Sequence, residues 1–227
     1  MAEVKEVRSR TENEVVVERA KDFWTQYNRP ILIACAAIIL VAGGYLVYQY
    51  FYKAPQEKKA VEAMFNAENY YRMDSLQAAL RGDGVNQGFL KIIDKYGGTK
   101  SANLARFYAG DIYLKQGDFK NAAKYLGDFK TDSKLIQARA YKLLGDAYAE
   151  QGKNKDALAA YKKAAHYFEE DEQNSSEYLF MAAYFASRVV NDKKEATDLF
   201  KELKEKYPRT ERGFEADKYL AQLGVYE

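Results

Sequence analysis

The stretch that decides the fold runs from Tyr141 to Tyr161 and reads YKLLGDAYAEQGKNKDALAAY. The same pattern occurs 35 residues upstream, with Gly110 at the position of Gly145, in FYAGDIYLKQGDFKNAAKYL. A third and more diverged copy begins at Phe180. Each copy holds two segments of helical apolar periodicity around a short polar turn. The sequence therefore predicts stacked helical hairpins, each of which leaves an apolar face for its neighbour.

The clearest copy resembles the tetratricopeptide repeat, a family of helical hairpins that stack into a superhelix. The resemblance is carried by Tyr141, Leu144, Gly145, Tyr148, Ala157 and Tyr161. The upstream copy departs at Arg106, where an aromatic residue is expected, and the third copy has Tyr184 in place of the small glycine. The polar segment EEDEQNSS (169–176) before the third copy is expected to be a solvated linker between repeats.

An all-α fold also fits the composition, because proline is scarce (3 residues) and Ala, Lys, Glu and Leu are plentiful. We expect a tetratricopeptide-type α-solenoid preceded by one transmembrane helix. The expected parts are a tail (1–29), a transmembrane helix (30–52) and a repeat domain (56–227) that comprises a diverged hairpin (57–96), three repeats (103–134, 138–169 and 177–208) and a capping helix (211–223).

A membrane span is predicted from Pro30 to Tyr52, where 23 residues carry no charge. About 20 apolar residues suffice to cross roughly 30 Å of hydrocarbon. Aromatic residues crowd both ends of this segment, as rings that settle at headgroup depth would. The basic residues of the tail favour a cytoplasmic N-terminus, which would place the repeats outside the cytoplasm. A cytosolic repeat domain, as in an organelle import receptor, would need the opposite topology.

The tail before the span has a helix signature of its own. Thr11 and Glu14 are spaced as a capping box. One face of the predicted helix would carry Val16, Ala20, Phe23, Trp24 and Tyr27. Such an amphipathic helix would lie at the membrane surface or dock on a membrane partner. A solvated tail with a few apolar residues is the alternative.

Composition and motifs argue against catalysis and against nucleic acid. A formal net charge of +2 provides no general attraction for nucleic acid. With one cysteine, Cys35, and one histidine, His166, a single copy cannot assemble a disulfide, a zinc cluster or a Cys-His pair. The acidic run at 169–172 lacks the ligand spacing and turn glycine of calcium loops. We expect no catalytic, cofactor or metal site, so the chain should not be an enzyme.

The expected function is the binding of protein segments. In tetratricopeptide proteins the first helix of each hairpin lines the inner face of the superhelix. By register, the candidate protein-binding groove here consists of Phe107, Asp111, Lys115, Arg139, Lys142, Asp146, Glu150, Met181, Phe185 and Arg188. Family members that clamp a terminal carboxylate use asparagine where this chain has Asp111 and Asp146, which argues against that mode of binding.

The whole layout resembles one particular family. It has a tail that ends in FWTQYNRP (23–30), an apolar span with Gly43, Gly44 and Tyr45, and then EKKAVEAMFNAENYY (57–71) leading into the repeats. This arrangement resembles the bacterial YfgM family of ancillary Sec translocon subunits.

The resemblance to the YfgM family implies a single-pass protein of the bacterial inner membrane with a periplasmic tetratricopeptide domain. It implies SecYEG subunits and a PpiD-like membrane-anchored chaperone as partners, and exported polypeptides as clients. A scaffold of another envelope assembly or motility machine would share the same sequence features and is the alternative function.

Overall fold

The computed structural model describes the backbone of residues 12–226, and the side chains of residues 17–226 apart from residue 20. It divides into two compact units, Met1–Pro55 and Gln56–Glu227. The expected all-α class is confirmed, since the only β-type pairing in the described chain is an isolated bridge between Gly82 and Gln87.

The helices in chain order are α1 (Glu12–Val47), η1 (Tyr48–Lys53), α2 (Ala54–Arg72), α3 (Leu76–Arg81), α4 (Phe89–Lys95), α5 (Lys100–Lys115), α6 (Phe119–Asp128), α7 (Lys134–Glu150), α8 (Asn154–Tyr167), α9 (Glu172–Phe185), η2 (Ala186–Val190), α10 (Lys193–Lys206) and α11 (Glu211–Gln222). The elements η1 and η2 are π-helical.

The first unit consists of α1 and η1. It contains a helix long and apolar enough to span a membrane, and no residue of its most apolar window is buried. The expected tail helix and residues 30–47 of the expected span form the single helix α1, which has Pro30 inside it, and residues 48–52 of the span lie in η1. Thr11 of the expected capping box lies outside the described residues, as do the side chains of Glu14, Val16 and Ala20. The rings of Phe23 and Tyr27 lie in a tilted contact on the exposed surface of the helix, with centroids 4.9 Å apart.

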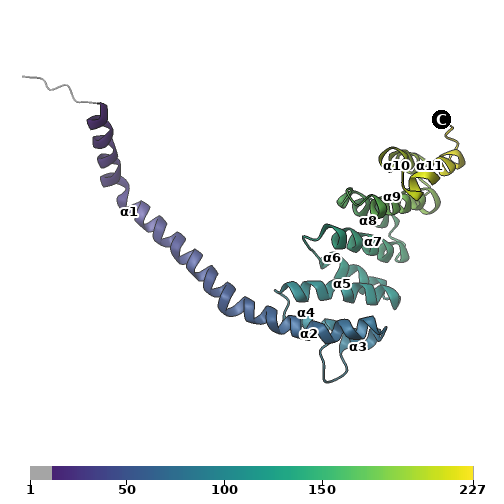
Figure 1. Ribbon diagram of the computed structural model, residues 1–227, viewed down its shortest axis with the longest axis horizontal. Helices are drawn as coiled ribbons and strands as arrows, with labels where there is room; N and C mark the ends of the chain where they lie inside the picture. Colours follow the sequence, from purple (N-terminus) through teal and green to yellow (C-terminus); the bar gives the residue numbers. More distant parts are fainter. Residues whose placement is uncertain (1–11, 227) are drawn as a thin grey trace, which may run out of the picture. The chain divides into compact units, whose positions relative to one another are not determined.

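In the second unit, hairpins α5–α6, α7–α8 and α9–α10 stack in chain order, and α11 covers the last of them (Figure 1). The small residues of the repeat lie where the two helices of a hairpin meet. A Cβ built on Gly145 would lie 2.5 Å from Tyr161 Cε1, and one on Gly110 would lie 2.5 Å from Leu126 Cγ. Both distances are too short for real contacts, so only glycine permits this approach of the helices.

The hairpin turns share one backbone conformation. Gly117, Gly152 and Asn191 each follow the first helix of a hairpin with a positive φ, of 76°, 70° and 60° respectively. This left-handed residue ends the first helix. In the first and third hairpins, the next residue, Asp118 or Asp192, caps the second helix by accepting a backbone N–H.

The third hairpin differs from the others by the π-helical turn η2 just before Asn191. A π turn adds one residue to a helix. Counted back from the turn, Ala183 therefore takes the position of Gly145, and Tyr184 takes that of Asp146. Ala183 is fully buried and Tyr184 is 43% exposed. The sequence register that placed Tyr184 at the glycine position was wrong by this one residue.

Two segments between the repeats also differ from the expectation. The stretch before residue 82 divides into α2 and α3, because Asp74 adopts a left-handed φ of 57° and ends α2. The segment 169–176 is not a linker throughout, because α9 begins at Glu172. Asp171 caps α9 by accepting the backbone N–H of Asn174, and Ser175 and Ser176 are buried.

Two hydrophobic clusters form the interior of the repeat unit. We call them the N-terminal core, which extends from Ala60 to Ala122 and includes Ala147, and the C-terminal core, which extends from Ala138 to Leu220. Helix α7 contributes to both cores, so it joins the two halves of the array.

Candidate functional site

The first helices of the three hairpins hold the predicted groove residues. On α5, Asp111 is buried and is held by two partners. Tyr71 of α2 donates its hydroxyl to Asp111 Oδ2 at 2.5 Å, and Lys115 Nζ lies 2.9 Å from the same oxygen. Lys115 also donates to the Tyr71 hydroxyl at 2.9 Å and lies over the Tyr71 ring. The carboxylate of Asp111 therefore stabilises the packing of α2 on α5.

The pKa values of this group agree with internal pairing. Burial, and then the hydrogen bond to Asp111, raise the pKa of Tyr71. Burial alone would lower the pKa of Lys115, but its bonds to Tyr71 and Asp111 outweigh that effect and raise it. Tyr71 and Lys115 therefore keep their protons at neutral pH and continue to donate to Asp111.

Asp146 occupies the equivalent position on α7 and is paired in a similar way. Lys142 Nζ lies 2.8 Å from Asp146 Oδ2, and the Tyr161 hydroxyl of α8 donates to Oδ1 at 3.0 Å. Burial, and then the charge of Asp146, raise the pKa of Tyr161. Both aspartates of the predicted groove are thus satisfied within the chain, which leaves them little capacity to bind a partner.

The aromatic and thioether members of the predicted groove pack inward. Phe107 lies against Phe129, with ring centroids 5.4 Å apart. Met181 and Phe185 are partly buried against the C-terminal core, where Phe185 contacts Tyr161 edge to face at 5.4 Å. The extra residue of η2 explains this placement, because it moves Phe180 and Tyr184 to the positions equivalent to Lys142 and Asp146.

Arg139 on α7 is the predicted groove residue best placed to meet a partner. It is exposed, and no carboxylate pairs with it among the residues that the structure describes. Burial raises the pKa values of Tyr108 on α5 and Tyr178 on α9, and the charge of Arg139 opposes both shifts. The charge of Arg139 thus acts on tyrosines of both neighbouring first helices.

The two remaining groove residues lie toward the ends of their helices. Glu150 is exposed at the end of α7. Arg188 in η2 donates to Gln222 Oε1 of α11 at 2.7 Å and lies over the Tyr184 ring. Sequence reasoning missed Tyr71, Tyr108, Tyr178 and Tyr184, which lie beside the predicted charges. The tyrosines carry no motif, and only the stacking of the hairpins brings them to this face.

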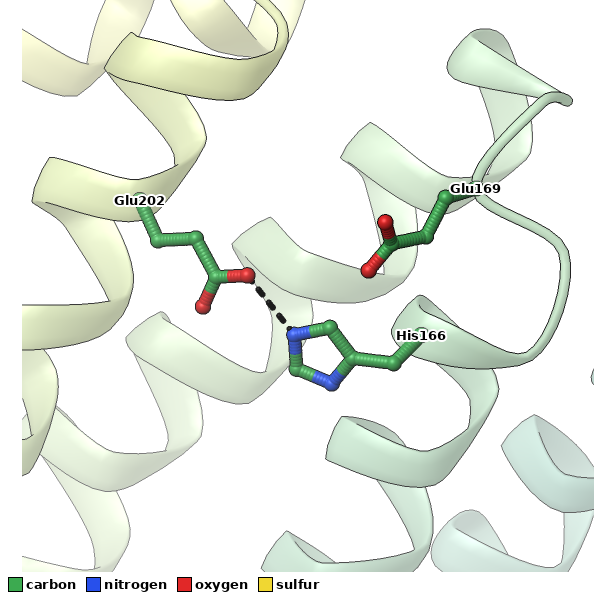
Figure 2. A group of neighbouring side chains, drawn as sticks. All are labelled: His166, Glu169 and Glu202. Carbon is green, nitrogen blue, oxygen red and sulfur yellow. Dashed lines mark hydrogen bonds and ion pairs between the residues drawn. The ribbon is translucent and has the colours of Figure 1, made fainter.

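One cluster on α8, the segment after it and α10 has the composition of a metal site. His166, Glu169 and Glu202 offer ligand atoms within 4.8 Å of one another, and Figure 2 shows Glu202 directed at the imidazole. His166 Nε2 lies 2.8 Å from Glu202 Oε1. Lys206 Nζ, however, lies 2.8 Å from Glu169 Oε1 and 3.0 Å from Glu202 Oε1.

An ammonium group therefore supplies the positive charge between the two carboxylates of this cluster. The hydrogen bonds to Glu169 and Glu202 raise the pKa of Lys206, so it stays charged. A metal ion would have to displace a paired lysine. We read the cluster as a set of ion pairs that ties α8 and the segment after it to α10.

Comparison with known protein families identifies the family of the chain. The model of the tetratricopeptide repeat-like domain matches residues 21–135, slightly more than half of the chain. The match covers the apolar segment of α1, the opening helices and the α5–α6 hairpin. No curated protein shows a significant match to the chain.

Proposed function

Because the chain belongs to the tetratricopeptide repeat-like domain family, a fold typical of protein–protein interaction scaffolds, we propose that it is a membrane-anchored scaffold of the bacterial envelope. In this proposal α1 spans the inner membrane with the N-terminus in the cytoplasm, and the repeats lie in the periplasm. The protein would act as an accessory subunit of the SecYEG translocon and pass exported chains to a PpiD-like chaperone.

One observation carries the proposal. The family match begins at residue 21 and therefore includes the apolar segment together with the first repeat. A helix of membrane-spanning length and a repeat array thus occur together in the family pattern. The resemblance of residues 23–30 and 57–71 to the YfgM family adds the translocon as the specific partner.

The binding surface proposed for this role is the face of the first helices around Arg139. Its acidic residues Asp111 and Asp146 are paired internally, whereas Arg139 has no ion-pair partner in the described chain. Tyr184 is exposed on the third hairpin, at the position equivalent to Asp146. An unpaired guanidinium with aromatic neighbours suits extended protein segments, because arginine and tyrosine contribute strongly to binding at protein interfaces.

Site-specific photo-crosslinking in the native host tests this proposal. A photoreactive residue would replace Tyr45 in the span, Arg139 or Tyr184 on the first helices, and Lys155 on α8 as a control on the opposite helix layer. We expect adducts with translocon subunits from Tyr45, and adducts with exported chains or a periplasmic chaperone from Arg139 and Tyr184. Adducts only with another envelope complex would favour the alternative scaffold, and adducts only with cytosolic proteins would contradict the topology.

A further inference from the structure

A hollow of about 520 Å³ lies between α5 and α7 of the repeat unit, and none of its lining residues belongs to the predicted groove. It is formed by the start of α5, the segment that follows α6 and the start of α7. The lining residues are Lys100, Asn103, Leu104, Phe129, Lys130, Thr131, Asp132 and Ile136.

The floor of the hollow is apolar. Phe129 is buried, Leu104 packs against the N-terminal core, and Ile136 is 36% exposed. Phe107 lies behind Phe129 and supports it. An apolar surface of this kind gains stability when a partner side chain removes it from water.

Hydrogen bonds hold the walls of the hollow in place. The Asn103 side chain donates to the Lys130 carbonyl at 2.5 Å, and the Thr131 N–H donates to Gln137 Oε1 at 2.8 Å. On the α5 side, Glu57 accepts the backbone N–H of Lys100 at 2.7 Å. The hollow is thus preformed, which lowers the entropic cost of binding.

Two lysines among the lining residues give the hollow its charge character. Lys100 and Lys130 are both exposed, and neither has an ion-pair partner within residues 17–226 as described. Asp132 is the one acidic lining residue. The nearby carboxylate of Glu57 accepts the backbone N–H groups of Lys100 and Ser101, and the charge of Lys100 contributes to lowering its pKa. Both lysine side chains are exposed, so their ammonium groups can reach an incoming anion.

We propose that this hollow binds a short extended segment of a protein partner in which one large apolar side chain is flanked by carboxylates. The apolar side chain would pack on Leu104, Phe129 and Ile136, and the carboxylates would pair with Lys100 and Lys130. A free phosphate or a nucleic-acid backbone would leave the apolar floor uncovered. The inference rests on the proposed scaffold role but not on the translocon as the partner.

Fluorescence anisotropy with the full-length protein in detergent micelles tests the inference. The probe is a labelled peptide with one phenylalanine between two pairs of aspartates. One matched peptide replaces the aspartates by asparagine, and another replaces the phenylalanine by alanine. The charge variant is K100Q/K130Q, and its control, K155Q/K194Q, removes two exposed lysines elsewhere. Ile136→Ser removes part of the floor.

We expect the probe to bind the wild-type protein and the control variant equally. K100Q/K130Q should weaken binding by roughly tenfold, since each partly exposed charge pair contributes about 0.7 kcal/mol. The asparagine peptide should lose a similar amount, and both Ile136→Ser and the alanine peptide should weaken binding further. Circular dichroism of each variant should match that of the wild-type protein, because all five substituted side chains reach solvent.

Three outcomes would overturn the inference: no binding of the probe to the wild-type protein, binding that K100Q/K130Q leaves unchanged, or equal binding of the asparagine peptide. A photoreactive residue at Ile136 that joins a second copy of the chain instead of the peptide would also overturn it. If the peptide does not bind while the translocon adducts still form, only the proposed role of the hollow is wrong. If the peptide binds but no translocon adducts form, the translocon is not the partner and the role of the hollow stands.

Discussion

Gly145 marks the closest approach of two helices, and its replacement tests how the repeat packs. Gly145→Ala would bring a methyl group to 2.5 Å from Tyr161 Cε1. The ring cannot easily retreat, since Tyr161 is buried and bonded to Asp146. We expect a loss of roughly 1–3 kcal/mol in unfolding free energy, measured by urea denaturation of the full chain.

The control for Gly145 is Gly127, which is also helical but has nothing within 4 Å of a built Cβ. Alanine there should be neutral or stabilising by about 0.5–1 kcal/mol, because glycine is the poorer helix former. Equal effects at the two glycines would show that helix propensity, not close packing, decides the response.

Glu57 gives a pH-dependent contribution to stability. Burial alone would raise its pKa, but hydrogen bonds from the Ser101 side chain and the backbone of Lys100 and Ser101, together with the charge of Lys100, outweigh burial and lower it. The folded state therefore favours the carboxylate, and the resulting stabilisation is present above the unfolded pKa and lost as the pH falls through the folded pKa.

The prediction for Glu57 concerns the difference between the wild-type protein and Glu57→Gln. Above pH 5 the wild-type protein should be the more stable by about 1 kcal/mol, typical of a charged helix cap. The difference in urea midpoint should shrink as the pH falls from the unfolded pKa of glutamate through the lower folded pKa of Glu57, because the carboxylate takes up its proton over that range. A difference that stays constant from pH 6 to pH 3.5 would mean that the charge of Glu57 is not what caps α5.

Asp111 and Asp146 illustrate how far the candidate site could be predicted. Their shared position on two first helices followed from the 35-residue period, which fixes the register of each hairpin. The hydrogen-bond partners of the two aspartates could not be predicted from this period. Tyr71 lies 40 residues before Asp111, and only the packing of α2 on α5 brings its hydroxyl within 2.5 Å of the carboxylate.

The hairpin elements themselves were predictable, because apolar periodicity and the turn glycines mark both helices of α5–α6 and α7–α8. Two local features of the backbone could not be predicted from the sequence. Asp74 ends α2 in the left-handed conformation without a glycine signal, and η2 adds a residue inside a helix without interrupting its apolar face. This added residue shifted the predicted positions of Met181 and Phe185 away from the first-helix face.

Asn191 allows a test of the shared turn geometry. It holds φ at 60°, the conformation that glycine supplies in the first two hairpins. Asn191→Ala should destabilise the chain by roughly 1 kcal/mol, since alanine tolerates left-handed backbone poorly. Asn191→Gly should be no less stable than the wild-type protein. If the alanine and glycine variants were equally stable, the left-handed turn would not determine the stability of the third hairpin.

The orientation of the whole molecule can be measured with thiol chemistry, because the chain has one cysteine, Cys35, within the proposed span. In a Cys35→Ser background, Lys155→Cys places a single thiol on the exposed surface of α8. A membrane-impermeant maleimide should label this thiol in cells with a permeabilised outer membrane. An engineered Ala2→Cys should stay unlabelled until the inner membrane is lysed. The reverse pattern would place the repeats in the cytosol.

The two cores of the repeat unit share α7, the helix that also carries Arg139. Amide hydrogens in such an array exchange through the opening of contiguous segments, and each core defines one such segment. A client bound at Arg139 would contact α7, the helix common to both cores. Binding of the client should slow amide exchange in α2 and in α11 together, although the client contacts neither helix. Occupancy of a site in the middle of the array could then be measured at its two ends.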